Sequence, residues 1–138
     1  MIKKITGAFV LLLLFAGCGK DDGSYIPNVL VNFNISVQEF KIVSVKTDGI
    51  LTVDNQGVAG LIIIEKAPRV YVAFDRCSSV NPEQRCKVIA DNRFVATDPC
   101  SGAKFSLIDG GPQKKPAVRY LKSYRVSLGS DDRINVSN

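Results

Sequence analysis

Apolar and polar residues alternate in short runs along the chain from residue 28 onward. Residues 29–37 alternate over most of their length, which is typical of a half-buried strand. No later window of a dozen residues shows a 3.6-residue apolar period, so strands are expected throughout. The further predicted strands are 40–45, 50–53, 60–64, 69–74, 87–89, 94–96, 104–107 and 121–128.

Turn-forming residues separate these runs. They lie at 47–49, 54–57, 90–92 and 109–111, and all four stretches combine Asp or Asn with other turn formers. Many short strands with tight turns predict an all-β domain, a small antiparallel sandwich or partly open barrel over residues 28–138. The sequence shows no internal repeat and no second domain.

The N-terminal segment has a different pattern. Residues 1–17 place two lysines before an apolar run that is too short to span a bilayer comfortably, the layout of a secretory signal peptide. Its end, Phe-Ala-Gly followed by Cys18, resembles the lipobox of bacterial lipoproteins, in which the cysteine is lipidated and becomes the first residue. An uncleaved anchor, or an ordinary signal peptide followed by a chance cysteine, is the alternative.

Residues 18–27 are polar and are expected to form a flexible tether behind the lipidated Cys18. Acyl chains at Cys18 would anchor the protein stably in a membrane. The segment Lys20-Asp21-Asp22 resembles the signal that sends some lipoproteins of Gram-negative bacteria to the cell surface. We therefore expect a protein anchored in the outer membrane and exposed on the cell surface, with the periplasmic face as the alternative.

Composition and charge exclude several function classes. The 138 residues carry a formal net charge of +5, which removal of residues 1–17 with Lys3 and Lys4 lowers to +3. The remaining basic residues are scattered and show no aromatic interleaving, so no nucleic-acid partner is expected. The chain contains no histidine, which removes the commonest metal ligand and general base.

Residues 60–126 contain paired strands at 61–64 and 70–77, the segment Asp-Pro-Cys-Ser-Gly-Ala-Lys-Phe at 98–105, and a strand and turn at 106–110. This arrangement resembles the Rieske domain, a small β fold that carries a [2Fe–2S] cluster. A Pro-containing loop and a final strand at 111–126 complete it. The family pattern for the second loop is Cys-Pro-Cys-His-Gly-Ser-x-Phe. The resemblance implies a Rieske-like fold.

The four cluster-ligand positions that the resemblance implies are Cys77, Ser79, Asp98 and Ser101. A Rieske centre needs two thiolates and two imidazoles, and only one of these ligands is kept. After lipidation of Cys18, three cysteines remain, too few for an all-cysteine cluster or a structural zinc site. We therefore expect no iron–sulfur cluster, no metal and no other cofactor.

Many Rieske proteins join the two cluster loops by a disulfide, and the resemblance places Cys86 and Cys100 at its positions. The first loop is longer here, running from Cys77 to Cys86, and this insertion leaves the alignment of Cys77 open. The expected pairing makes Cys77 the odd thiol. Three reduced thiols are the alternative, although an exported protein lies where disulfides persist.

Two function hypotheses follow. In the first, the chain is a non-enzymatic binding or structural module that uses its loops to contact an unknown protein or glycan. In the second, which family resemblance alone would suggest, it is an electron-transfer protein or oxidoreductase component, but fold does not carry function when the site residues are absent. A hydrolase would need Lys104 or Asp98 to act as the base beside Ser101, and such lone polar residues are common in loops.

Overall fold

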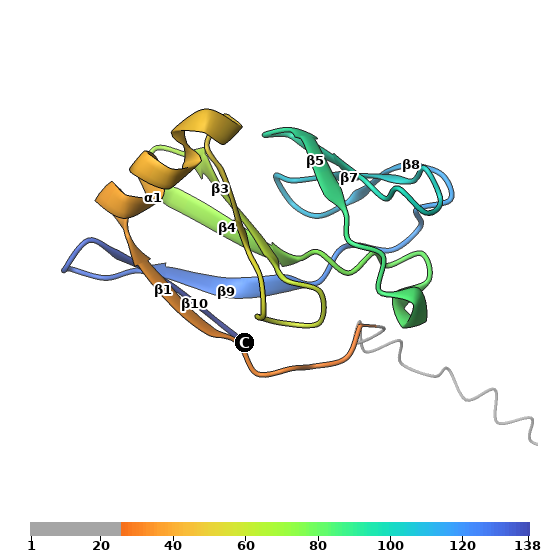
Figure 1. The fold of residues 1–138 in the computed structure, drawn as a ribbon, viewed down its shortest axis with the longest axis horizontal. Coiled ribbons are helices and arrows are strands. Elements are labelled where there is room, and N and C mark those ends of the chain that lie inside the picture. The colour runs from red at the N-terminus through yellow and green to blue at the C-terminus, as the bar shows by residue number, and fades with distance from the viewer. Residues whose placement is uncertain (1–25) are drawn as a thin grey trace, which may run out of the picture.

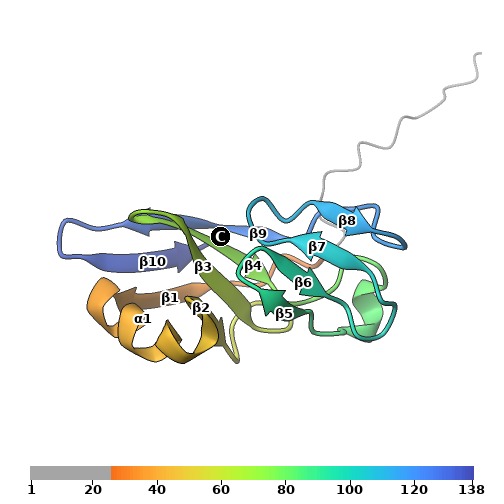
Figure 2. The same cartoon turned by 90° about the horizontal axis from the view of Figure 1, so that it is seen from above.

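In the computed structural model, which describes residues 26–138, the chain forms two antiparallel sheets. Six strands form the larger sheet in the order β1-β10-β9-β4-β3-β2, and four form the smaller one in the order β5-β6-β7-β8. The sheets lie at opposite ends of the molecule's long axis (Figures 1 and 2). The all-β prediction is confirmed. The strands are β1 (Asn32–Ser36), β2 (Ile50–Val53), β3 (Leu61–Ala67), β4 (Val70–Asp75), β5 (Ile89–Asn92), β6 (Val95–Thr97), β7 (Lys104–Ser106), β8 (Pro112–Lys114), β9 (Ser123–Leu128) and β10 (Arg133–Ser137).

Strand β3 connects the two halves of the core because both of its faces are buried. Leu61 and Ile63 pack into a cluster with Phe40 and Tyr71, while Ile62 and Ile64 pack on the other side. A strand buried on both faces should read as a continuous apolar run, as residues 61–64 do. Full burial of each such side chain contributes about 1.5–3 kcal/mol.

The cluster that contains Ile62 and Ile64 fills the space between the two sheets. Phe74 of the larger sheet packs with Phe105 and Ala96 of the smaller one, and Leu121 and Ala117 close the same cluster from the loop before β9. This interior fixes the smaller sheet, and with it the loops at its end, against the larger sheet.

The segment 40–45, predicted as strand, is helical instead. Helix α1 (Val37–Ser44) begins where Ser36 caps it, with the Ser36 Oγ accepting from the Glu39 amide at 3.1 Å, and a 3-10 helix over Val45–Thr47 follows. Within α1, Val37 and Phe40 lie one turn apart and are both buried. The prediction of strand at 40–45 was wrong because eight residues are too few to show a helical period, and the N-cap was not recognised.

Other boundaries also differ from the predicted pattern. Residues 90–92 were predicted as a turn but all belong to β5, and β8 and β10 were not predicted. Strand β10 alternates Ile134 and Val136, both buried, with exposed Asn135, so the period-2 signal was present. A second short 3-10 helix over Pro82–Gln84 lies within the predicted first loop.

The N-terminal part of the described chain is held firmly against the domain. Ile26 is buried and packs with Ala59 and Cys77. The Lys122 ammonium donates to the Ile26 and Pro27 carbonyls at 3.5 and 3.3 Å. Asn138 accepts from the Val31 amide and donates to the Val29 carbonyl, which places the C-terminal residue beside this segment (Figure 1). Cys18 and Lys20 to Asp22 lie outside the described residues. Within 26–138, no helix is long and apolar enough to cross a membrane.

Candidate functional site

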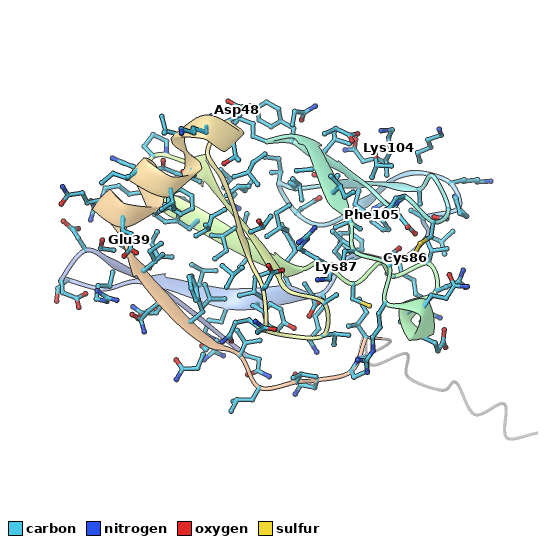
Figure 3. All side chains as sticks on the ribbon, viewed as in Figure 1. Glu39, Asp48, Cys86, Lys87, Lys104 and Phe105 are labelled. Atoms are coloured by element: carbon cyan, nitrogen blue, oxygen red, sulfur yellow. A yellow bond between two sulfur atoms is a disulfide. The ribbon has the colours of Figure 1, made fainter. Side chains whose placement is uncertain are left out.

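Two loops meet at one end of the smaller sheet. The first runs from Cys77 to Cys86 and the second from Asp98 to Ala103, and they are joined by a disulfide between Cys86 and Cys100 with a Cα–Cα distance of 6.3 Å. Figure 3 shows this bond beside Cys86 at the right of the view. The two cysteines flank the hairpin of β5 and β6, whose antiparallel strands bring their ends together. The structure thus contains the pair that the family resemblance implied.

Asp98, the first residue of the second loop, accepts hydrogen bonds from both loops. Its carboxylate is 2% exposed and accepts hydrogen bonds from the Ser78 and Ser101 hydroxyls, both at 2.7 Å. The Cys100 amide donates to its other oxygen at 2.8 Å. A buried carboxylate with several donors is well satisfied without a cation. The two loops are therefore held together both by a covalent bond and by a polar cluster of Ser78, Asp98 and Ser101.

The protonation of Asp98 follows from this environment. Burial of the carboxyl raises its pKa, whereas the hydrogen bonds from Ser101, Ser78 and the backbone lower it by more, so its net pKa lies below the ordinary value. The group is therefore ionised at neutral pH. This keeps all of its acceptor positions available to the surrounding donors.

Cys77 and Ser79 have hydrogen-bond partners other than Asp98. The Cys77 thiol is fully buried, its Sγ lies 3.5 Å from the Pro82 carbonyl oxygen, and burial raises its pKa to about 11. The Ser79 hydroxyl donates to the Arg119 carbonyl at 2.9 Å and so joins the first loop to the segment before β9. The structure thus brings together Asp98 and Ser101 of the four predicted ligand positions, with Ser78 as a third partner that sequence reasoning missed.

A second buried carboxylate, also missed from the sequence, lies at the end of β4. Asp75 is 0% exposed and accepts from the amides of Val58, Ala59 and Cys77 and from the Tyr124 hydroxyl, at 2.7–3.0 Å. Burial and this contact with Asp75 raise the pKa of Tyr124 far above its ordinary value. Gly57 has a positive φ, and a Cβ there would collide with Asp75, so the turn before Val58 requires glycine.

These donors do not fit a [2Fe–2S] cluster. The cluster needs four thiolates, or two thiolates and two imidazoles. The sequence has no histidine, the sulfurs of Cys86 and Cys100 are bonded to each other, and Cys77 is turned toward Pro82. Among the described residues, the group with metal-ligand spacing is Cys86, Asp98 and Cys100, and its two sulfurs are consumed by the disulfide.

The two bases that a hydrolase could use, Lys104 and Asp98, have different surroundings. The Lys104 ammonium lies 2.5 Å from an Asp91 carboxylate oxygen and 2.7 Å from the Thr97 hydroxyl, so it is paired within the smaller sheet. The Ser101 hydroxyl donates to Asp98, which has a lowered pKa and is a poor base at neutral pH.

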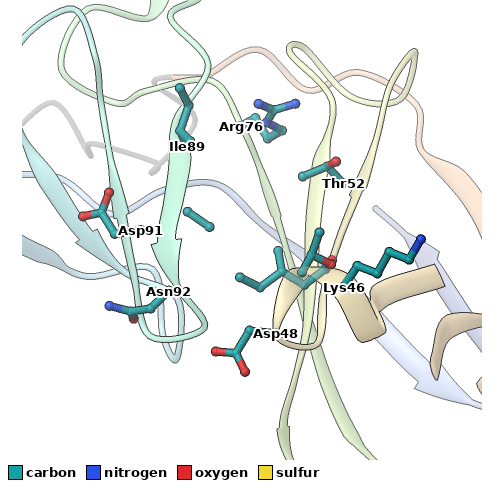
Figure 4. Close-up of a pocket in the computed structure, with 10 residues that line it drawn as sticks. Lys46, Asp48, Thr52, Arg76, Ile89, Asp91 and Asn92 are labelled. Carbon is teal, nitrogen blue, oxygen red and sulfur yellow. The ribbon is translucent and has the colours of Figure 1, made fainter. Parts of the chain in front are cut away.

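A separate open cleft of about 410 Å³ lies between the two sheets (Figure 4), and neither disulfide cysteine lines it. Strand β2 contributes Ile50 and Thr52, and β5 contributes all four of its residues. Its charged side chains are of both signs, Lys46 and Arg76 against Asp48 and Asp91. The cleft is a mixed polar and apolar surface and does not adjoin the polar cluster around Asp98.

Comparisons with known proteins concern the fold. No family model matches the sequence, and no curated protein is significantly similar to it. Among solved structures, the plasma membrane Rieske protein of the cyanobacterium Synechocystis is similar, with a TM-score of 0.52 and 19% identity over 80% of this chain and 99% of that one. The ferredoxin of carbazole 1,9a-dioxygenase from Nocardioides aromaticivorans gives a TM-score of 0.50 and 15% identity over 78% and 94%. At these identities the likeness concerns the fold alone, and the chain has a Rieske-like fold.

Proposed function

We propose that this chain is a lipoprotein of the outer membrane, exposed on the cell surface, whose Rieske-like domain carries no iron–sulfur cluster and acts as a non-enzymatic binding module. The observation that carries the proposal is the chemistry at the ligand positions. Ser79, Asp98 and Ser101 hold three of the four, and their side chains are used in hydrogen bonds within the protein. The lipobox-like sequence before Cys18 supports the anchor.

The binding surface follows from the loops. We define the loop tip as residues 77–86 together with 116–121, which the Ser79 to Arg119 hydrogen bond joins. Val118 and Tyr120 are 74% and 62% exposed on this tip. Aromatic residues are enriched in protein–protein interfaces, and a disulfide-supported loop loses little conformational freedom on binding. The proposed partner is a protein that covers these two side chains.

Iron and sulfide analysis separates this proposal from an electron-transfer function. The protein should be colourless after expression with ample iron and sulfide and should contain no acid-labile sulfide. An electron-transfer protein with a [2Fe–2S] centre would instead be coloured and contain about two irons per chain. That result would overturn the proposal.

Membrane attachment is tested by Cys18→Ala. This variant should be released from the membrane fraction or accumulate as an unprocessed precursor, because the acylated thiol is absent. A variant that fractionates and migrates like the parent would contradict the lipoprotein assignment. Protease accessibility in intact cells then distinguishes the cell surface from the periplasmic face.

The loop tip is tested by site-specific photo-cross-linking in intact cells. A cross-linker at position 118 should yield an adduct of defined mass. The matched control is position 42 on α1, where Ile42 is similarly exposed at 65% but lies at the other end of the molecule. Equal adducts from both positions, or none from 118, would contradict a partner at the tip.

A further inference from the structure

Three potential metal ligands from the two loops lie close together. The sulfurs of Cys86 and Cys100 and a carboxylate oxygen of Asp98 all lie within 4.8 Å of one another. Cys100 is exposed and Cys86 half-buried, so the disulfide is open to a small reductant, while Asp98 is buried beneath it. Reduction would therefore convert a covalent cross-link into a set of two thiols and one carboxylate.

We propose that Cys86, Cys100 and Asp98 form, after reduction of the disulfide, a three-ligand site for a thiophilic divalent cation of the Zn²⁺ class. A small dithiol reduces the protein: the Cys86–Cys100 bond breaks, each sulfur receives one hydrogen, and the dithiol becomes a cyclic disulfide. Binding of the cation then releases the two thiol protons. Two thiolates and one carboxylate are a donor set that Zn²⁺ accepts in four-coordinate sites, with water in the fourth position.

The site requires the two sulfurs to separate. In a tetrahedral site with metal–sulfur bonds of about 2.3 Å, neighbouring sulfur atoms lie about 3.8 Å apart, whereas the sulfurs of a disulfide lie about 2 Å apart. The Cα atoms of Cys86 and Cys100 are 6.3 Å apart, so rotation of the two side chains supplies this separation, and an Asp98 oxygen lies within 4.8 Å of both sulfurs. The Asp98 carboxylate is oriented by Ser78, Ser101 and the Cys100 amide. Such hydrogen bonds to a ligating carboxylate are the outer-shell support found in metal sites.

The site is distinct from a Rieske centre and independent of the proposed function. It uses the two disulfide cysteines and leaves out Cys77 and Ser79, whose side chains bond to Pro82 and Arg119. A binding module without an iron–sulfur cluster could possess or lack such a site. Failure of one proposal therefore does not decide the other.

Cobalt titration tests the site. The full chain carrying Cys18→Ala and Cys77→Ala retains only the thiols of Cys86 and Cys100. After anaerobic reduction and removal of the dithiol, it should bind one Co²⁺ per chain with the thiolate-to-metal absorption of a four-coordinate site, and Zn²⁺ should displace the Co²⁺. The oxidised form should give no such absorption. A reduced chain that is folded by circular dichroism and gives no absorption overturns the proposal.

Matched carboxylate variants test the third ligand. Asp98→Asn should weaken Co²⁺ binding by about 10-fold or more, a loss on the order of that seen when metal-site support is removed, whereas Asp91→Asn on β5 should not change it. Equal affinities in the two variants overturn the role of Asp98. X-ray absorption of the zinc-loaded parent is independent of variant folding: two sulfur neighbours with two oxygen neighbours support the site, and four or no sulfur neighbours contradict it.

Discussion

Two buried aspartates, Asp75 and Asp98, have similar hydrogen-bonding surroundings, but they connect different parts of the chain. Both are almost fully buried, at 0% and 2% exposure, and both accept hydrogen bonds at each carboxylate oxygen. The donors to Asp75 lie on the turn before β3, on Cys77 two residues after β4, and on β9. The donors to Asp98 all belong to the two loops at the disulfide.

This difference shows that a buried carboxylate can stabilise either the whole domain or a single pair of loops. Asp75 connects segments from Val58 to Tyr124 and so contributes to the domain as a whole. Asp98 connects only the two loops, which Cys86 and Cys100 also join covalently. Loss of Asp75 should therefore affect global unfolding, whereas loss of Asp98 should affect mainly the loops. The following variants test this contrast.

Asp75→Ala should have the largest effect. It would leave the buried amides of Ala59 and Cys77, the partly buried amide of Val58 and the buried Tyr124 hydroxyl without an acceptor. Each unsatisfied buried group costs about 1–3 kcal/mol. We expect the free energy of unfolding to fall by about 4 kcal/mol or more, measured by urea denaturation. The control is Asp91→Ala, whose half-exposed carboxylate pairs with Lys104 and should matter by less than about 1 kcal/mol. Similar losses in both variants would contradict a special role for Asp75.

Cys100→Ser should have the next largest effect. The disulfide closes a loop with a sequence separation of 14, for which the chain-entropy estimate is about 3 kcal/mol. Cys77→Ser should cost less, about 1 kcal/mol, because the serine hydroxyl can donate to the Pro82 carbonyl as the thiol does. Thermal unfolding with and without reductant measures both. A parent protein whose stability is unchanged by reduction would argue against the cross-link.

Asp98→Asn should have a smaller effect that depends on pH. The folded-state pKa of Asp98 lies below its ordinary value, so its stabilisation is fully present above the unfolded pKa of about 3.9 and is lost as pH falls through the folded pKa. We expect the substitution to lower the free energy of unfolding by about 2 kcal/mol at pH 7. This difference from the parent should become smaller at acidic pH. A difference that stays constant from neutral to low pH would show that the carboxylate charge is not involved.

Tyr124→Phe should have the smallest effect. It removes one hydrogen bond to Asp75 while the three amides continue to donate to that carboxylate. We expect a loss of about 1 kcal/mol, and this loss should largely vanish when the substitution is made in the Asp75→Ala background, because the acceptor is already absent. Additive losses in that double-mutant cycle would mean that Tyr124 acts through packing alone.

The sequence predicted the strands whose burial pattern is simple. Ile50–Val53 was predicted with the observed bounds, and the apolar run at 61–64 identified the central strand β3. The prediction failed at α1, where a short helix depends on the cap at Ser36 and on packing of Phe40 against Tyr71, with ring centroids 5.2 Å apart. Such tertiary contacts override local strand propensity.

The candidate site was predictable only through the resemblance. The positions of Cys86, Cys100, Asp98 and Ser101 followed from the family pattern, and the structure places all four in the loops at the disulfide. The roles of Ser78 and Asp75 depend on contacts with residues 20 and 49 positions away. No local sequence pattern encodes such distant partners. An aspartate at the end of an apolar strand is nevertheless a signal, because a buried charged residue is unusual.

The hydrogen bonds of Asn138 have a practical consequence for labelling the protein. Its side chain bonds to Val31, Val29 and Asn28, so a tag fused after this residue would be forced to emerge beside the N-terminal segment and could displace it. The turn between β9 and β10, at residues 129–132, lies at the far end of the molecule (Figure 1). An epitope or fluorophore inserted there would label the domain without contacting the N-terminal segment or Asn138.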